Sequence, residues 1–454
     1  MKKVLIIAYF FPPLGWSGVQ RTLKYVKYLR NFGWEPVVVT VGNTKFSIKD
    51  ESLLKEIPED ITIVRIDDIL LKGITDPFKK QLIELIKPTF EIAEKSSLFD
   101  EYCNQIEQYF EKIRNMILLP DSLALWAQQV AKKISLKMNL NTIDLIYTTS
   151  GPYSSHLVGF ILKRNFNIPW VADFRDEWTN NPYFHYDEND IKYKIERELE
   201  TKIVSSADRI TTTTPMATRN YIKLFNLPLQ KVVTITNGFD EEDFRDIGIS
   251  KTNSKFTIVH NGSFYLVRDP FSFLRAIYNL IEKNLINKEK ICIKFLGKDD
   301  EIIKNGVCQI DVFKLVEWVP YLPHLQSIQE SNNSDLLLLV AGAEDRVKSM
   351  VPGKLFEYMR IRKPILAISP KGSVIEDLLI HTGTGNNFGY NDIHGMEEYI
   401  FQTYRRWING NDSFSVNESE IMKYGRKNLT QKLAAIFDQV TSDCNTQRIV
   451  NMKN

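Results

Sequence analysis

The chain has 454 residues, of which 43% are apolar and 25% are charged, and its formal net charge is +2. This length exceeds the size at which a single hydrophobic core keeps growing, so we expect two domains of roughly 200 residues each. A nearly balanced charge argues against a protein built mainly to bind nucleic acid, because such proteins concentrate a basic excess on one face. The four cysteines lie far apart and form no C-x-x-C pair, which indicates reduced thiols in a cytoplasmic protein.

The N-terminus shares some features with a secretory signal. Two lysines precede an apolar run over residues 4–11, but Pro12-Pro13 and Gly15-Trp16 then occupy the place of a small-residue cleavage site. We therefore predict that this run is a first buried strand. No apolar run approaches the ~20 residues that a membrane-spanning helix requires.

Strand and helix patterns alternate along the first half of the chain, which predicts a parallel, doubly wound α/β sheet. A helix-rich insert at about 76–140 interrupts the alternation. The predicted elements are strands at 4–9, 36–41, 61–66, 145–148, 170–174, 210–213 and 232–236, and a helix at 19–32.

The alternation restarts after residues 237–253, which are polar and rich in turn formers and therefore predict a domain hinge. We expect two successive Rossmann-like domains over residues 1–240 and 254–423, followed by a terminal segment at 424–454. The predicted elements of the second half are strands at 256–260, 291–296, 335–340 and 364–368, and a helix at 270–282.

The most informative segment covers residues 349–359, where Pro352-Gly353 opens an apolar helix with Lys354 on its first turn and Glu357 one turn later. Backbone N–H groups at a helix N-terminus carry partial positive charge and suit a diphosphate. A carboxylate on the same face can accept hydrogen bonds from ribose hydroxyls. The pattern therefore predicts a site for an anionic nucleotide, although an ordinary helix with Pro at its first position explains it equally well.

Six segments span both halves of the chain in the order of one known family: 9–18, 170–178, 236–244, 261–270, 318–324 and 349–359. In these segments the chain resembles the retaining GT-B glycosyltransferases of family four, particularly the bacterial members that build surface polysaccharides. The resemblance implies two Rossmann-like domains that face each other across a cleft, with the sugar nucleotide on the C-terminal domain and the acceptor on the N-terminal domain. A final helix at 424–440 is placed to cross back to the first domain.

The resemblance also implies a function, namely transfer of a hexose from a nucleotide-diphosphate donor to a saccharide or lipid-linked acceptor. Retention of configuration would come from attack on the face that the diphosphate leaves. We find no convincing metal-binding D-x-D, because Asp187 and Asp190 lie in a polar loop and Asp299-Asp300 has no acidic partner. We therefore expect no metal cofactor, and fixed cations that stabilise the departing diphosphate.

Arg268 follows the first strand of the second domain, where the family carries a phosphate-binding cation, although it could instead pair with Asp269. The family often has another Arg after the glycine of this loop, whereas this chain has Ser263 after Gly262. Lys354 is the candidate that compensates for the missing charge.

The remaining donor-side candidates follow the same resemblance. Glu357 matches the second, ribose-binding Glu of the family's E-x7-E signature, and Ser349 replaces the first. The backbone at Gly353 and Leu355 would bind the diphosphate at the helix N-terminus. The loop that carries Trp318 and Val319 would read the base, or would serve as a rigid strand-to-helix connection.

On the acceptor side, Gly15 and Gly18 would let the backbone approach a ligand without interference from a Cβ atom. Asp173 and Arg175 follow a buried strand, and so fall at the sheet edge where open α/β sheets bind ligands. An internal Asp–Arg ion pair is the alternative. We expect His156 to be structural.

The predicted insert at 76–140 mixes apolar and basic residues, most clearly over residues 78–87. A basic amphipathic helix can rest on an anionic membrane surface, which would suit a lipid-linked acceptor at the inner face of the membrane. Packing on a domain core is the commoner reason for such a pattern.

Three other functions fit a pair of doubly wound domains. A dinucleotide-dependent oxidoreductase is disfavoured, because the loop after the first strand lacks G-x-G-x-x-G and residues 38–43 end without an acidic residue for an adenosine ribose. A nucleotide-sugar epimerase and a non-catalytic scaffold, in which Ser349 marks an inactive site, remain open.

Overall fold

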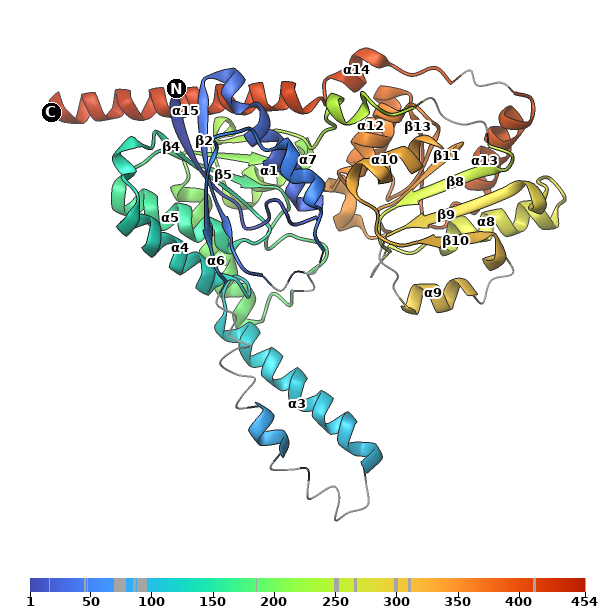
Figure 1. Cartoon of the computed structure of the whole chain (residues 1–454), viewed down its shortest axis with the longest axis horizontal. Helices are drawn as coiled ribbons and strands as arrows, with labels where there is room; N and C mark the ends of the chain where they lie inside the picture. The colour runs from blue at the N-terminus through green and yellow to red at the C-terminus, as the bar shows by residue number, and fades with distance from the viewer. Residues whose placement is uncertain are drawn as a thin grey trace.

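A computed structural model (Figure 1) describes the chain except residues 16, 45, 47, 69–78, 85–86, 88–95, 185, 249–252, 265–267, 298–300, 309–311, 411–413 and 454. The described residues form two α/β domains, which confirms the predicted fold class. The first contains a seven-stranded sheet with the order β3-β2-β1-β4-β5-β6-β7, and the second a six-stranded sheet with the order β10-β9-β8-β11-β12-β13. All strand pairs within these two sheets are parallel.

The N-terminal domain alternates strands with covering helices. Its strands are β1 (Lys2–Ile7), β2 (Trp34–Val41), β3 (Thr62–Ile66), β4 (Leu145–Thr149), β5 (Trp170–Phe174), β6 (Arg209–Thr212) and β7 (Val232–Thr234). Its helices are α1 (Ser17–Tyr28), α3 (Ser96–Ile117), α4 (Ala124–Lys137), α5 (Ser154–Phe166), α6 (Ile191–Ser206) and α7 (Pro215–Phe225), with short 3-10 turns η1 (Leu29–Phe32), η2 (Glu51–Glu56), η3 (Leu140–Thr142), η4 (Leu229–Lys231) and η5 (Glu241–Phe244).

The C-terminal domain repeats this arrangement. Its strands are β8 (Phe256–Asn261), β9 (Ile291–Leu296), β10 (Val316–Val319), β11 (Leu336–Val340), β12 (Ile365–Ile368) and β13 (Gly385–Phe388). Its helices are α8 (Phe271–Glu282), α9 (Glu301–Cys308), α10 (His324–Asn332), α11 (Lys354–Ile361), α12 (Val374–Thr382), α13 (Ile393–Ile408) and α14 (Glu418–Met422), with 3-10 turns η6 (Lys288–Lys290), η7 (Phe313–Leu315) and η8 (Asp345–Ser349).

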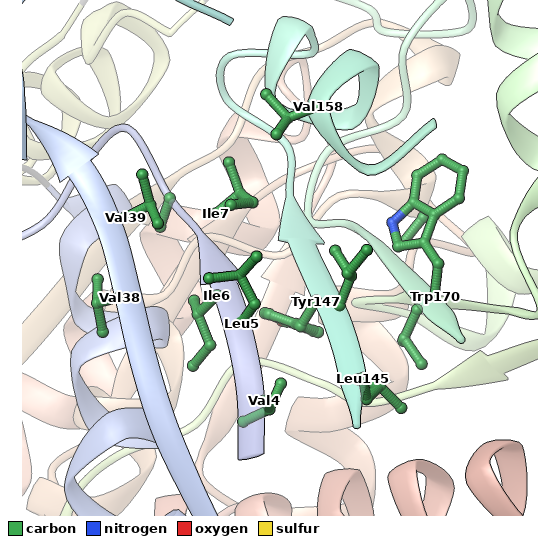
Figure 2. Packing of buried hydrophobic residues seen from close by; sticks show 14 of the residues in the cluster. Val4, Leu5, Ile6, Ile7, Val38, Val39, Leu145, Tyr147, Val158 and Trp170 are labelled. Carbon is green, nitrogen blue, oxygen red and sulfur yellow. The ribbon is translucent and has the colours of Figure 1, made fainter. Parts of the chain in front are cut away.

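The central strand β1 shows why the buried strands were predictable. Val4, Leu5, Ile6 and Ile7 are all 0% exposed. Figure 2 shows these side chains on β1, which lies between β2 and β4, among buried residues of both neighbouring strands. A parallel strand covered by helices on both faces must be apolar at every position, so its sequence reads as a continuous apolar run.

Two edge strands, β10 and β13, were not predicted. In β10 no residue is fully buried, and β13 has the sequence Gly-Asn-Asn-Phe, in which only the last residue is buried. An edge strand exposes part of its surface and needs no continuous apolar run, so neither sequence carries the usual strand signal.

The predicted insert divides into two different parts. Helix α3 projects away from the sheet, as Figure 1 shows. Helix α4 instead packs on α5 and buries Trp126, Ala127 and Val130 in the N-terminal core, so the projecting part ends before residue 124. Of the amphipathic segment at 78–87, residues 78 and 85–86 lie outside the described residues. The described Lys79 forms an ion pair with Glu107 of α3.

The last helix, α15 (Arg426–Lys453), returns to the N-terminal domain and runs along it in Figure 1. The ring of Phe437 lies 5.3 Å from Trp34 and 5.7 Å from Tyr147, centroid to centroid. At the start of β1, the Lys2 ammonium lies 2.8 Å from the Asp438 carboxylate. Within the described residues, no helix is both long enough and apolar enough to cross a membrane.

Candidate functional site

The carboxyl-edge loops of the two sheets meet and contact each other. The Tyr321 hydroxyl donates to the Gly15 carbonyl at 2.7 Å, and the Thr214 hydroxyl donates to the Ser349 carbonyl at 2.7 Å. The guanidinium of Arg268 donates to the Tyr183 hydroxyl and lies over its ring, 4.8 Å from the centroid. Loops from both domains therefore form one continuous site region at the sheet edges, where open α/β sheets bind ligands.

The loop after β8 folds tightly beneath the ammonium group of Lys354. Gly262 has a φ of +135°, and a Cβ atom there would lie 2.0 Å from the Lys354 Nζ. Gly297, which follows β9, has a φ of +142°, and a Cβ there would lie 3.0 Å from the Ser263 backbone nitrogen. Both positions therefore require glycine for conformation and for space. The predicted residues Gly262, Ser263 and Lys354 are thus brought together.

Lys354 is a cation held in a poorly hydrated place. Burial, together with the nearby Arg268 charge, lowers its pKa to about 7, although Glu357 opposes the change. Within the described part of the chain, no carboxylate forms an ion pair with its Nζ. The site therefore has positive charge that an incoming anion could neutralise.

Arg268 supplies the second cation. Burial lowers its pKa to about 10, and Asp176 opposes this effect from the N-terminal domain. Asp269, the alternative partner considered from the sequence, accepts hydrogen bonds from the Phe271 N–H at 3.0 Å and from the Tyr390 hydroxyl. After burial, the positive charge of Arg268 is the second cause that lowers the pKa of Lys354.

Glu357 lies on α11 beside a histidine that the sequence reading missed. The His324 Nε2 and the Glu357 Oε1 are 2.8 Å apart. Burial alone would raise the pKa of Glu357, but His324 lowers it below its ordinary value, so the carboxylate stays ionised. His324 lies in the segment 318–324 that carries the family resemblance, and its place at the start of helix α10, directly after Pro323, was the available signal.

The N-terminus of α11 is only partly available to a ligand. A Cβ on Gly353 would meet nothing within 4 Å, so the space beside it is open. Leu355 differs from the prediction, because its side chain is 0% exposed in the core and its N–H donates to the Pro352 carbonyl at 3.1 Å. The backbone positions that remain candidates are therefore Gly353 and Lys354.

Ser349 faces the other domain. Its hydroxyl donates to the Glu177 Oε2 at 2.5 Å, and Glu177 also accepts from the side-chain amides of Asn180 and Asn220. Ser349 is only 5% exposed. Its observed partner is thus a carboxylate of the N-terminal domain. Glu177 belongs to the segment 170–178 and was not singled out from the sequence.

Trp318 and Val319 do not form a base-reading loop, which corrects the sequence prediction. Both belong to strand β10, where they pair with Phe295 and Leu296 of β9. The Val319 carbonyl accepts from the Gly297 N–H at 2.9 Å, and the Trp318 ring packs against Phe295 at 5.3 Å. The Val319 carbonyl and the Trp318 ring therefore already make contacts within the domain.

Gly15 and Gly18 are approached by protein groups. A Cβ on Gly15 would lie 2.8 Å from the Tyr321 hydroxyl oxygen, and one on Gly18 would lie 2.4 Å from an Arg175 guanidinium nitrogen. Arg175 donates to the Gly18 carbonyl at 2.7 Å. These glycines therefore make room for neighbouring side chains, and Arg175 joins the start of α1 to the loop after β5.

Asp173 is a structural residue, which corrects its predicted catalytic role. It is 0% exposed and receives two hydrogen bonds from Arg21 of α1, at 2.8 and 2.9 Å. The hydroxyls of Thr149 and Thr211 donate to the same carboxylate at 2.8 and 2.7 Å. Both of its oxygens thus accept hydrogen bonds from side chains of α1, β4 and β6.

The acidic groups considered for a metal have other partners. Asp187 and Asp190 accept from the backbone N–H groups of Asn189 and Lys192, at 2.9 and 3.0 Å. Asp299 and Asp300 lie outside the described residues. His156 is buried, with its Nδ1 2.7 Å from the Thr148 hydroxyl.

Comparisons with known proteins show similarity in one sequence region and in the overall fold. Residues 98–243 match a family model described as Glycosyltransferase Family 4. No curated protein matches the sequence. Sucrose-phosphate synthase from Thermosynechococcus elongatus is similar in structure, with a TM-score of 0.67, 12% identity, and coverage of 98% of this chain and 100% of that one.

Two further solved structures have the same fold. Anabaena HepE in complex with UDP and glucose has a TM-score of 0.56, 14% identity, and 100% coverage of both chains. A Listeria monocytogenes protein proposed to be a UDP-N-acetylglucosamine 2-epimerase has a TM-score of 0.55, 12% identity, and 98% coverage of both chains. At such low sequence identity, the structural similarity establishes the fold alone. The family match over residues 98–243 supports a glycosyltransferase. Residues 98–243 are therefore similar to Glycosyltransferase Family 4, and the chain has the two-domain GT-B fold.

Proposed function

We propose that the protein is a hexosyltransferase that moves a sugar from a nucleotide-diphosphate donor to a saccharide or lipid-linked acceptor, with retention of configuration and without a metal ion. The observation that carries the proposal is the half-buried pair of cations, Arg268 and Lys354, at the Gly262 loop. Two like charges in a poorly hydrated place repel each other, and an anion between them relieves the repulsion. A nucleoside diphosphate is an anion of suitable charge.

The chemistry of the donor explains why such a pair is useful. Negative charge grows on the diphosphate as the glycosyl–phosphate bond breaks, so fixed cations directed at it lower the barrier. The N-terminus of α11 adds the partial positive charge of its helix dipole. Glu357, one turn further along α11, would accept hydrogen bonds from the ribose.

Metal independence is proposed from the partners of the acidic residues. Within the described residues, one group of carboxylates has the spacing of a metal site, namely Glu56, Asp240 and Asp243. Lys24 already binds this group, with its Nζ 2.7 Å from Asp243 and 3.0 Å from Asp240. An ammonium group thus occupies the place of a cation.

The acceptor would bind on the N-terminal side of the site region, near Arg175. We propose the cytoplasm as the site of action and surface polysaccharide synthesis as the pathway. A lipid-linked acceptor would bring the protein to the inner face of the membrane.

A thermal-shift screen with UDP, GDP, ADP, TDP and CMP in the presence of EDTA tests the proposal, because a ligand stabilises the folded state by mass action. We expect one nucleotide to raise Tm, and Arg268→Ala and Lys354→Met each to abolish the rise. Lys348→Met is the matched control, because Lys348 lies on η8 and pairs with the exposed Asp345 at 3.0 Å. An unchanged rise in Arg268→Ala would contradict the proposed role.

Incubation with the corresponding nucleotide sugar separates the remaining functions. A transferase slowly releases its sugar to water, an epimerase yields an isomer, and a non-catalytic scaffold does neither. Release of sugar with transfer to an added acceptor is the expected result. Accumulation of an isomer would replace the transferase proposal with the epimerase.

A further inference from the structure

His324 occupies a junction between three parts of the chain. On the side of the C-terminal domain, its Nε2 lies 2.8 Å from the Glu357 Oε1. Towards the linker between the domains, its Nδ1 lies 3.9 Å from the Asp243 Oδ2. Its backbone N–H donates to the Asp50 Oδ2 of the N-terminal domain at 3.1 Å. One residue therefore contacts three carboxylates from three separate regions.

The charges around this junction favour a protonated ring. Lys24 of α1 binds Asp243 and Asp240, and it also pairs with Glu56 of η2. The Lys27 Nζ lies 2.8 Å from the Asp240 Oδ2, and the positive charge of Arg426 in α15 helps to lower the pKa of Glu357. Besides His324, three cations therefore lie among these carboxylates, namely Lys24, Lys27 and Arg426. Burial would lower the pKa of His324, but Glu357 and Asp243 together raise it above its ordinary value, while Lys24 opposes them.

We propose that His324 is a positioning residue, which orients Glu357 for the donor ribose when the two domains are closed against each other. The proposal rests on the proposed function, because the ribose is part of the nucleotide donor. His324 itself does not touch the donor. Asp50 holds the backbone N–H of His324, Asp243 lies beside the ring Nδ1, and the ring Nε2 orients the Glu357 carboxylate.

The geometry explains how this positioning works. The ring occupies Oε1 of Glu357, and within the described residues no hydrogen bond is made to Oε2, so this second oxygen remains for a ribose hydroxyl. An imidazolium also keeps the carboxylate ionised, which strengthens hydrogen bonds that it accepts. Separation of the domains would remove Asp50 from the His324 N–H, and the backbone that carries the ring would lose its hydrogen bond to the N-terminal domain.

The test compares His324→Ala and His324→Gln with the intact protein. Titration calorimetry measures the Kd of the nucleotide that gives the largest thermal shift among UDP, GDP, ADP, TDP and CMP. We expect His324→Ala to raise Kd, and the KM for the matching nucleotide sugar, about ten-fold, with kcat changed less than about two-fold, because one charge-assisted hydrogen bond is lost. His324→Gln keeps a neutral donor and should recover part of the affinity.

The pH dependence supplies a readout that a merely structural residue would not move. Affinity of the intact protein should fall about five-fold more than that of His324→Gln as pH rises from 6 to 9, because only the histidine loses a charge. Lys354 also titrates near this range, but it is present in both proteins and cancels in the comparison. Parallel pH profiles would overturn the proposal.

Glu241→Gln is the matched control. Glu241 lies on η5 like Asp243, and it pairs with Arg360 of α11 without touching Glu357. It should leave Kd within about two-fold of the intact protein. An equal loss of nucleotide affinity in Glu241→Gln and His324→Ala would show that affinity depends on contact between the domains in general. That result would overturn the positioning role of His324.

The two proposals fail in different ways. If no nucleotide shifts the intact protein, the proposed function fails, and the role of His324 fails with it. If the intact protein binds a nucleotide and His324→Ala binds it equally well, only the positioning role is wrong. Circular dichroism and Tm of each unliganded variant confirm that a loss of affinity does not come from unfolding.

Discussion

The Ser349 hydroxyl donates a hydrogen bond to the Glu177 Oε2 across the boundary between the two domains, at 2.5 Å. Glu177 is 5% exposed; its Oε1 accepts from Asn180 and Asn220 of its own domain, whereas its Oε2 accepts from Ser349 of the other domain. A buried carboxylate without this donor would retain an uncompensated lone pair. The pair therefore favours the closed arrangement of the domains.

Removing this donor should loosen the boundary between the domains without unfolding either core. We expect Ser349→Ala to destabilise the closed form by about 1–3 kcal/mol, the cost of a buried polar group without its partner. Small-angle scattering should record a larger radius of gyration. Ser419→Ala is the control, because Ser419 is exposed and its hydroxyl donates to the nearby Asn417 side chain at 2.9 Å. An unchanged radius in Ser349→Ala would show that other contacts hold the domains.

Asp173 should be important for stability. Asp173→Ala leaves Arg21, which is 2% exposed, as a buried charge without its partner, so we expect a loss of about 3–5 kcal/mol in the free energy of unfolding. Chemical denaturation measures this loss. Glu35→Gln is the control, because it breaks the more exposed Arg30–Glu35 pair and should cost less than about 1 kcal/mol.

The same ion pair gives a pH dependence with a definite sign. Burial would raise the pKa of Asp173, but pairing with Arg21 lowers it below 3.8. A lowered pKa in the folded state means that the stabilisation is present above 3.8 and is lost as pH falls through the lower, folded value. The acid limb of the stability curve should be shallower in Asp173→Ala. Identical acid limbs would contradict this assignment.

Nucleotide binding should weaken as pH rises because of Lys354. Its pKa is about 7 in the free protein, and a bound diphosphate would raise this value. Affinity should therefore be greatest below pH 7 and fall as pH rises through 7 towards the pKa of the complex, with proton uptake on binding in that window. Calorimetry in buffers of different ionisation enthalpy measures the uptake.

Lys354→Arg provides the control for this titration. Arginine stays charged throughout the range, so the uptake assigned to position 354 should disappear while the positive charge remains. The same uptake in Lys354→Arg would assign the proton to another group.

The buried strands were predictable because burial on both faces imposes an apolar residue at each position, as in Val4 to Ile7 of β1. The edge strand β13 could not be predicted in this way, because its Asn386 and Asn387 are not buried. Its Asn387 is instead held by Ser369, whose hydroxyl donates to the side-chain oxygen at 2.6 Å. Such a contact depends on the folded arrangement.

The candidate site shows a similar division. Gly262, Lys354 and Glu357 could be predicted, because each belongs to a local pattern within its own segment of the sequence. His324 and Glu177 were missed, because their importance comes from partners 33 and 172 residues away along the chain. Local patterns also could not distinguish a ligand-facing carboxylate from one that binds a distant arginine, as Asp173 binds Arg21.

The return of α15 has a consequence for biosynthesis. Leu429, Leu433 and Phe437 complete the hydrophobic core that begins with the first strand of the chain. During translation, the N-terminal half therefore emerges with an apolar surface that stays uncovered until residues 426–440 have left the ribosome. A chain shortened before residue 426 would leave this surface permanently open to water, and we expect it to aggregate even though its C-terminal domain is intact.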